Sequence, residues 1–345
     1  MTDSLVLVAD AGDNSISTFR FDGDSLERLA VSGGLTGTST FAVDSERGLV
    51  YAGVKPGGGH ESAGIVTLRL DRSSGALSEI SRRDLPDGGM AYLALARGGT
   101  VLLGASYGGG YGISALVTDG VIGETVTRTE YPNLHSVLPS ADGRFAYFVS
   151  LGADLIAQYA LGPDASLTPL DPPTVDAPAG SGPRHLVLND AGDAVYVVTE
   201  FTAQVLHYAR DTETGVLDLR GGADAFDPTQ GLTVSRFGAD PREEHLIWGA
   251  DLQLADGGRR VWASERTVGT LSSVAVAADG SLTASGTFVP TEPQPRGFGA
   301  SPDGRHLVVA GELSTTVSLY AVDGERLELL QQAETGRGAN WVRFV

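Results

Sequence analysis

The sequence predicts an all-β protein made of repeated four-stranded units, and three observations predict it. Two apolar strands joined by a turn rich in Asp and Gly recur along the chain. The copies follow one another at intervals of roughly 45 to 65 residues. A further copy is divided between the two ends of the chain. Together these features are typical of a β-propeller, whose blades are four-stranded repeats.

The strands can be followed in order through each unit. The clearest hairpins read HSVLPSADGRFAYFVS from residue 135, GPRHLVLNDAGDAVYVVTE from 182, GADLQLADGGRRVWASE from 249 and RGFGASPDGRHLVVAG from 296, with weaker copies from 41 and 92. A third strand follows, such as IAQYAL from 156 or VLHYAR from 205, and a fourth, such as GVLDL from 215. The units therefore begin near residues 38, 90, 135, 184, 249 and 296.

The chain ends supply one more unit. Residues 5–10, LVLVAD, resemble a second strand, and residues 340–345, NWVRFV, resemble a first strand. We expect the last strand to pair beside the first and close the ring. The prediction is a single seven-bladed β-propeller domain over residues 1–345, with four-stranded antiparallel blades.

This topology predicts which residues gather at one end of the central channel. The first strand of a blade lines the channel and the second runs back, so first-strand starts and second-strand ends share one face, here called the mouth. First-strand starts give His135, Arg184 and Arg296. Second-strand ends give Asp10, Lys55, Tyr107, Glu200, Glu265, Arg266 and Glu312.

Exposed strand ends often carry charge without any function, so no single one of these residues identifies a site. The collection favours one, because arginine forks bind carboxylate or phosphate and would repel one another without an anion between them. Strand alternation turns neighbouring side chains to opposite faces. His185, next to Arg184, is therefore interpreted as a packed histidine between blades.

Composition excludes several classes of partner. The net charge of −19, from 43 acidic and 24 basic residues, argues against nucleic acid or an anionic membrane. The chain has no cysteine, its first residues lack a basic segment, and no apolar run is long enough to span a membrane. We expect a cytoplasmic monomer. No zinc-ligand spacing is present, and the interleaved arginines argue against calcium, so no metal or cofactor is expected.

The motifs at residues 135–154, 182–200, 263–276, 290–312 and 335–342 resemble those of the seven-bladed propeller lactonase family. This family includes a bacterial type of 6-phosphogluconolactonase and the fungal carboxymuconate lactonising enzymes. The resemblance implies that His135, Arg184, Glu200 and either Arg266 or Arg296 form the site. Many relatives carry a second histidine two residues before the HSV motif, where this chain has Asn133.

The predicted function is a metal-independent lactonase that hydrolyses 6-phosphogluconolactone or a related sugar-acid lactone. His135 is the candidate general base, with Glu200 orienting it or sharing its role, and Arg184 is the candidate oxyanion stabiliser. The residues predicted to bind the substrate are Arg266, Arg296, Glu265, Asp10, Tyr107 and Glu312. Two alternatives stay open at this point: a cycloisomerase that closes a muconate-type diacid, and a non-catalytic binding platform.

Overall fold

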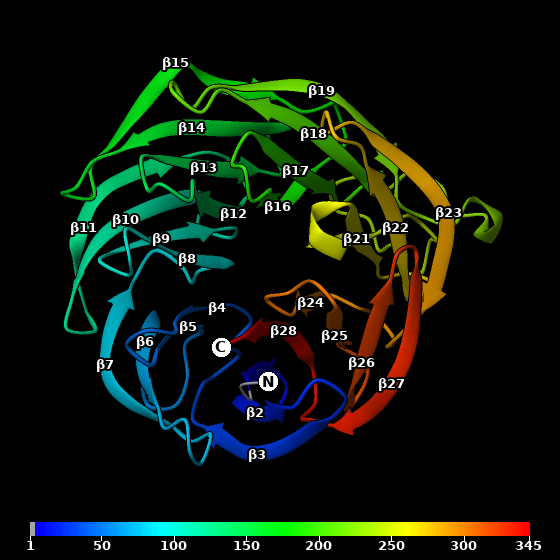
Figure 1. Ribbon diagram of the computed structural model, residues 1–345. Helices are drawn as coiled ribbons and strands as arrows, with labels where there is room; N and C mark the ends of the chain where they lie inside the picture. The colour runs from blue at the N-terminus through cyan, green and yellow to red at the C-terminus, as the bar shows by residue number, and fades with distance from the viewer. Residues whose placement is uncertain (1–3) are drawn as a thin grey trace.

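The computed structural model describes residues 4–345, which form seven four-stranded antiparallel sheets arranged in a ring (Figure 1). Each sheet is one blade, and the predicted seven-bladed β-propeller is confirmed. The blades are numbered here from the one that contains both ends of the described chain. Blade 1 has the strand order β28-β1-β2-β3, and blades 2 to 7 follow in sequence, each formed by four consecutive strands.

Each blade contributes one strand to each of four concentric layers. The innermost strands are β28 (Ala339–Phe344), β4 (Phe41–Asp44), β8 (Tyr92–Ala96), β12 (Leu134–Pro139), β16 (Pro183–Leu188), β20 (Gly249–Ala255) and β24 (Gly297–Ala300). The second strands are β1 (Ser4–Asp10), β5 (Leu49–Val54), β9 (Val101–Ser106), β13 (Phe145–Ser150), β17 (Ala194–Thr199), β21 (Arg260–Glu265) and β25 (His306–Ala310).

The two remaining layers lie farther from the axis. The third strands are β2 (Ser15–Phe21), β6 (Ala63–Leu70), β10 (Tyr111–Thr118), β14 (Leu155–Leu161), β18 (Gln204–Arg210), β22 (Thr270–Val276) and β26 (Thr316–Asp323). The outermost strands are β3 (Leu26–Gly33), β7 (Leu77–Leu85), β11 (Val121–Glu130), β15 (Leu167–Asp176), β19 (Leu217–Asp224), β23 (Leu282–Pro290) and β27 (Arg326–Glu334).

The hydrophobic core lies between the blades. The second strands β5, β9, β13 and β17 are buried along their whole length, because each is covered on both faces by a neighbouring blade. The outermost strands alternate instead, as in β11, where Ile122 is buried while Val121 is exposed. Within residues 4–345 the helices η1 (Pro228–Gln230) and η2 (Asp256–Gly258) are single turns. No helix in this described part is long and apolar enough to cross a membrane.

The ring is closed as the split repeat predicts. Strand β28 pairs antiparallel with β1, with Ala9 opposite Trp341 and Val6 opposite Phe344. The indole Nε1 of Trp341 donates a hydrogen bond to the carbonyl oxygen of Phe41 at 2.9 Å, which ties blade 1 to blade 2. The pairing of β28 with β1, here called the seam, thus closes the ring.

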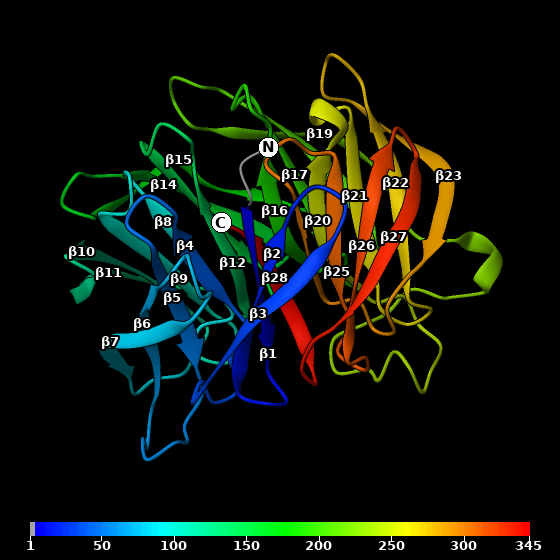
Figure 2. The ribbon, with the colours of Figure 1, turned by 60° about the horizontal axis from the view of Figure 1, so that its bottom comes forward.

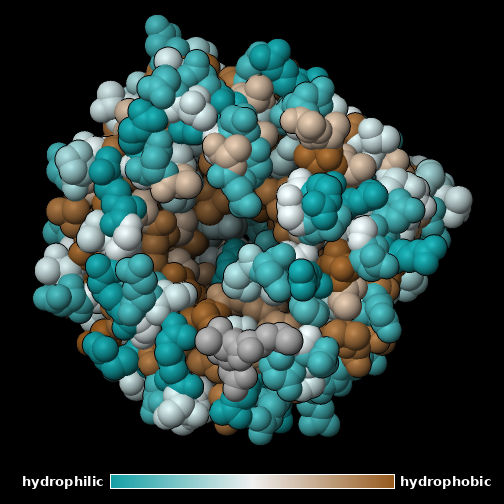
Figure 3. All heavy atoms as spheres, in the orientation of Figure 1, coloured by the Kyte–Doolittle hydropathy of each residue, from teal (hydrophilic) through white to brown (hydrophobic). Residues whose placement is uncertain are grey.

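The two faces of the ring differ. Strand β1 begins and β28 ends on one face, and the loop 225–248 extends from the opposite face, the mouth (Figure 2). The face shown in Figure 3 is hollowed at its centre, and hydrophilic side chains cover much of its rim. A cavity of about 310 Å³ is lined by residues at the ends of the innermost strands, among them Val43, Leu95 and Pro139. The predicted site residues lie at the mouth.

Replacing Trp341 by alanine should test the seam. Trp341 is 3% exposed, so Trp341→Ala removes its packing and its hydrogen bond to Phe41, and should lower the free energy of unfolding by roughly 3–5 kcal/mol. Urea unfolding followed by far-UV circular dichroism measures this. Leu329→Ala, on the outermost strand β27 and 51% exposed, is the control and should stay within about 0.5 kcal/mol of the parent. Equal effects of the two substitutions would contradict the assignment of the seam.

Candidate active site

One backbone hydrogen bond recurs at the mouth in six blades and explains how the site is assembled. In each, a residue one or two positions after the second strand donates its N–H to the carbonyl oxygen of a residue that precedes the innermost strand. The donors are Ala11, Lys55, Leu151, Glu200, Arg266 and Glu312, and the acceptors are Gly338, Thr36, Asn133, Gly182, Trp248 and Gln294, with N–O distances of 2.7–3.2 Å. Glu200, Arg266 and Glu312 therefore occupy equivalent positions in successive blades.

A second set of equivalent positions lies two residues after each acceptor. These positions hold Asn340, Thr38, His135, Arg184, Ala250 and Arg296. In β12 and β16 the strand pairing shifts register at His135 and Arg184, which is the mark of a β-bulge. A bulge inserts an extra residue and re-aims side chains, and bulges are common beside active sites. Both residues are thereby freed from strict strand alternation.

The structure brings six of the predicted residues together in one cavity of about 220 Å³. It is lined by Ala91, Tyr107, His135, Arg184, Glu200, Arg266 and Arg296. These residues come from blades 3 to 7, which supports the ring-shaped site that the topology predicts. The roles assigned to them stay predictions.

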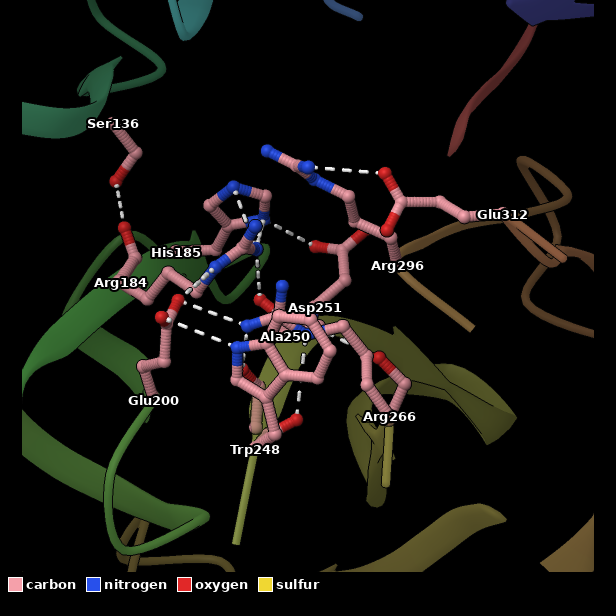
Figure 4. A network of polar contacts seen from close by, with 12 residues as sticks. Ser136, Arg184, His185, Glu200, Trp248, Ala250, Asp251, Arg266, Arg296 and Glu312 are labelled. Atoms are coloured by element: carbon pink, nitrogen blue, oxygen red, sulfur yellow. Dashed lines mark hydrogen bonds and ion pairs between the residues drawn. The ribbon is translucent and has the colours of Figure 1, made fainter. Parts of the chain in front are cut away.

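Glu200 joins two arginines (Figure 4). Its Oε2 accepts from Arg184 Nε at 2.8 Å and lies 2.9 Å from Arg266 Nη2, and its Oε1 accepts from Trp248 Nε1 at 3.4 Å. Burial alone would raise the pKa of Glu200, but Arg266, Arg184 and Arg296 together lower it below its usual value. Glu200 is thus an ionised carboxylate whose oxygens are engaged by cations and an indole.

The two buried arginines are held rigidly. Arg184 is 1% exposed, and its Nη1 donates to the carbonyl oxygen of Ala250. Arg266 donates from Nη2 to the carbonyl oxygen of Gly249 at 3.0 Å, and its guanidinium carbon lies 3.9 Å from the centre of the Trp248 ring. Burial, and after it the neighbouring charge of Arg266, lower the pKa of Arg184 to about 9, although Glu200 opposes the shift. The guanidinium of Arg184 therefore stays charged at neutral pH.

Arg296 is the most accessible of the three arginines. Its side chain is 35% exposed and its Nη1 donates to Glu312 Oε1 at 3.0 Å. Gln294 Nε2 donates to the other oxygen of Glu312 at 2.5 Å. Glu312 thus orients Arg296 from the edge of the cavity.

Each guanidinium keeps at least one nitrogen available for a ligand. Within residues 4–345 no partner is present for Arg184 Nη2, Arg266 Nη1 or Arg296 Nη2. The other nitrogens of Arg184 and Arg266 are held by carboxylate and carbonyl oxygens. The cavity therefore presents fixed, charged donors without having to reorganise them.

His135 is a buried, neutral histidine. Burial lowers its pKa well below the usual value, and the nearby Arg184 and His185 lower it further. Its ring lies edge-on to Tyr107, with centroids 5.4 Å apart. Its Nδ1 is buried and has no hydrogen-bond partner in the described part of the chain. Such an imidazole can accept a proton from a group that enters the cavity.

The orientation predicted for His185 is wrong. The bulge at Arg184 cancels the expected alternation, and His185 turns toward the channel axis instead of lying between blades. Its ring centroid lies 5.1 Å from His135, 5.2 Å from Tyr92 and 5.7 Å from Trp341, residues that come from three other innermost strands. It is nevertheless packed and hydrogen-bonded, as predicted.

Asp251, which the sequence analysis did not single out, fixes the state of His185. Its Oδ1 lies 2.8 Å from His185 Nδ1, and Arg184 Nη1 lies 3.1 Å from His185 Nε2. Since a guanidinium only donates, Nε2 accepts and Nδ1 carries the proton toward Asp251. His185 thus links Asp251 to Arg184 in a layer beneath the cavity. Asp251 lies directly after the bulged position of β20, and His185 lies directly after the bulged position of β16. An alignment of these two strands could therefore have identified Asp251.

Asp10 and Glu265 do not line the cavity, and their predicted contact with a substrate is corrected. Each lies one residue before the donor of the recurrent hydrogen bond in its blade, so its side chain points to the other side of the strand. Asp10 accepts from Ser17 and Thr335. Glu265 accepts from the backbone N–H groups of Trp248, Thr267 and Val268 at 2.8–3.0 Å. Burial raises the pKa of both carboxyls. Glu265 instead anchors the loop that carries Trp248.

Two further residues were missed by the sequence analysis. Trp248 ends the loop 225–248 and contacts Glu200 and Arg266, but the other five acceptor positions hold no tryptophan, so the repeat did not single it out. Asn340 is equivalent to His135 and Arg184 in blade 1, so an alignment of the innermost strands would have found it. Within residues 4–345 no group of three or more His, Cys, Asp or Glu is placed to hold a metal ion.

Comparison with known proteins places the chain in a family with this fold. Residues 4–344 match the family described as "Lactonase, 7-bladed beta-propeller". A 6-phosphogluconolactonase of Cronobacter sakazakii is 30% identical over 303 residues, which cover 87% of this chain and 85% of the relative. One of Sodalis glossinidius is 31% identical over 297 residues, covering 85% and 84%. The structure of the Pseudomonas aeruginosa periplasmic gluconolactonase PpgL superimposes with a TM-score of 0.85 at 25% identity, covering 100% of this chain and 99% of PpgL.

The buried histidines predict a loss of stability in acid. Burial lowers the pKa of His185 well below the usual value, so the folded ring stays neutral where the unfolded ring binds a proton. As pH falls below about 6.5, the unfolded state gains up to about 1.4 kcal/mol per pH unit relative to the folded state for each such histidine. Urea unfolding at several pH values should therefore show a shallower pH dependence for His185→Gln than for the parent. His60→Gln, in an exposed loop, is the control for removal of a histidine from the surface. An unchanged pH dependence in His185→Gln would contradict this prediction.

Proposed function

The chain belongs to the seven-bladed β-propeller lactonase family, and from this premise we propose that it hydrolyses a sugar lactone, with 6-phosphogluconolactone or a related sugar-acid lactone as its substrate. The observation that carries the proposal is the convergence of three arginines and a neutral histidine on one cavity. In a chain of net charge −19, this mouth is a local concentration of positive charge suited to an anionic ligand.

Lactone hydrolysis needs an activated water, a stabilised oxyanion and a proton for the leaving oxygen. In the proposed reaction a water attacks the carbonyl carbon of the lactone, and His135 takes its proton. The negative charge that forms on the carbonyl oxygen is stabilised by Arg184. The ring C–O bond then breaks, and the leaving alkoxide takes the proton back from His135. The net change is the addition of one water and the formation of a hydroxy acid.

The geometry favours His135 over Glu200 as the base. The carboxylate of Glu200 is engaged by the guanidinium groups of Arg184 and Arg266, so its Oε2 is not free to accept a proton from a water. The neutral ring of His135 has a nitrogen without a partner among the described residues. Glu200 is therefore proposed to position the two arginines, and the free Nη2 of Arg184 to stabilise the oxyanion.

The two alternative functions have less support. No observation at the cavity favours a cycloisomerase over a hydrolase, and both curated relatives named above are 6-phosphogluconolactonases. A mouth lined by buried charges is unlike the surface that a protein-binding platform needs, because charged residues are depleted from the centre of protein interfaces.

Several finer points remain proposals. Catalysis without metal is supported by an ester mechanism that the side chains of the cavity can carry out themselves. A cytoplasmic location and a monomeric state remain predictions of the sequence. Because the periplasmic PpgL has the same fold, the fold does not assign the compartment.

A panel of lactones tests the function. The purified protein should hydrolyse 6-phosphogluconolactone, and should do so equally well after dialysis against EDTA. Glucono-δ-lactone, a carboxylated lactone and a muconate diacid complete the panel. His135→Gln should lower kcat by about 10²- to 10⁴-fold, because the general base is lost. Turnover of the diacid alone would overturn the proposal in favour of the cycloisomerase, and loss of activity in EDTA would refute catalysis without metal.

Arg184→Gln should lower kcat/KM at least tenfold, which corresponds to about 1.4 kcal/mol of transition-state stabilisation. The matched control is Arg210→Gln in the same blade. Arg210 is also buried, but it bonds to Tyr147 and Gly192 away from the cavity, so its loss should reduce stability and leave kcat/KM near the parent value. Equal losses of kcat/KM in both variants would show that Arg184 acts only through the fold.

The pH dependence of kcat/KM should reflect the neutral histidine. A general base must be unprotonated, and the pKa of His135 is lowered well below its usual value. The acid limb of the kcat/KM profile is therefore expected below about pH 6.5, where an ordinary histidine would begin to protonate. An acid limb with an apparent pKa above 6.5 that persists in His135→Gln would exclude His135 as the base.

A further inference from the structure

A second cavity adjoins the first at the mouth and has no assigned role. It has a volume of about 330 Å³ and shares Ala91, Tyr107 and Arg296 with the first cavity. Its other polar side chains include those of Lys55, Glu312 and Asn340. It extends over blades 1 to 3 and 7, and so includes residues of blades 1 and 2, which the first cavity does not.

Lys55 is the most unusual residue of this second cavity. It is the only lysine of the chain and follows directly after β5. It occupies in blade 2 the position that Glu200, Arg266 and Glu312 occupy in theirs, with its N–H bonded to the carbonyl oxygen of Thr36 at 2.9 Å. Although the chain has 43 acidic residues, Lys55 has no ion-pair partner among residues 4–345.

The backbone at Gly37 makes room for the Lys55 side chain. A Cβ atom at Gly37 would lie 2.8 Å from Cδ of Lys55, and Gly37 has a positive φ of 56°. Both features favour glycine at this position. The stem of Lys55 is therefore placed against the wall of the cavity by the loop that precedes β4.

Two other groups of the cavity lack partners as well. Arg296 uses Nη1 for Glu312 and has no partner for Nη2 in the described part of the chain. Asn340 is 4% exposed, and its Oδ1 is buried without a hydrogen-bond partner among the described residues. An unpartnered buried amide oxygen costs free energy that a ligand hydroxyl would recover.

We propose that the second cavity is the subsite for the phosphate group of a phosphorylated sugar lactone, bound by Lys55 and Arg296, with Asn340 accepting a hydrogen bond from a sugar hydroxyl. This inference rests on the proposed function and extends it to the selection of substrate. A phosphate monoester carries about two negative charges at neutral pH, which two cations match, whereas a carboxylate carries one. Arg296 borders both cavities, so it connects this subsite to the reaction centre.

Substrate selectivity provides the first test. The quantity measured is the ratio of kcat/KM for 6-phosphogluconolactone to kcat/KM for glucono-δ-lactone. In Lys55→Met this ratio should fall at least tenfold, mainly through KM for the phosphorylated substrate, and Lys55→Arg should recover most of it. Arg69→Met removes one positive charge from an exposed position of the same blade and should leave the ratio unchanged, which controls for long-range electrostatics.

The outcomes separate the subsite from the function. If the parent hydrolyses both lactones but Lys55→Met leaves the ratio unchanged, the subsite is refuted while the proposed function stands. An equal fall in Arg69→Met would also refute it, because net charge would then be the cause. A parallel arm with a carboxylated lactone asks whether the subsite is a general anion site. If Lys55→Met weakens turnover of this lactone as strongly, the specific assignment to phosphate is overturned.

Chemical labelling of the single lysine gives a test that does not depend on turnover. Trinitrobenzenesulfonate should modify Lys55, and the modified peptide is identified by mass spectrometry. Inorganic phosphate and 6-phosphogluconate should slow this modification at concentrations at which gluconate does not. Such protection in a protein that hydrolyses no lactone would support the subsite while overturning the proposed function. Equal protection by gluconate, or none by either phosphate compound, would overturn the subsite.

Discussion

Closure of the ring is the constraint on which the rest of the structure depends. When β28 pairs with β1, seven innermost strands are held around one axis, and a residue at a given position of each blade faces the same channel. The recurrent hydrogen bond at the mouth then fixes where each second strand ends relative to the next innermost strand. A site can be built in this way from residues far apart in sequence, each supplied by a different blade.

The bulges of the innermost strands allow side chains to form two layers at the mouth. In a regular strand only every second residue would face the channel. The register shifts at His135 and Arg184 let adjacent residues face it, so that His185 and Asp251 form a layer directly beneath the cavity. The lower layer holds the upper one in place. A rigid guanidinium can stabilise charge in a transition state because it needs no reorganisation at the moment of reaction.

The buried charges of the mouth are tolerated because they are paired. Removing charged groups from water costs several kcal/mol per ion unless hydrogen bonds and opposite charges offset the loss. Glu200 between Arg184 and Arg266, and Glu312 beside Arg296, provide this compensation. The three arginines and Lys55 still exceed these two carboxylates, so an anionic ligand would complete the balance. The surface outside the mouth has the opposite character, as the net charge of −19 requires.

The sequence by itself determined the propeller, the seam and most of the mouth, because a repeat of strands and turns is a local pattern and its period sets the position of each blade. It therefore predicted that Tyr107, His135, Arg184, Glu200, Arg266 and Arg296 would converge. It misplaced His185, Asp10 and Glu265, which differ from true mouth residues by a shift of one position. It also missed Trp248, because no other acceptor position of the repeat holds a tryptophan. Only the tertiary structure decided these cases, because the direction of a side chain at a strand end depends on bulges and on contacts between blades, and a one-residue change of register turns it to the opposite face.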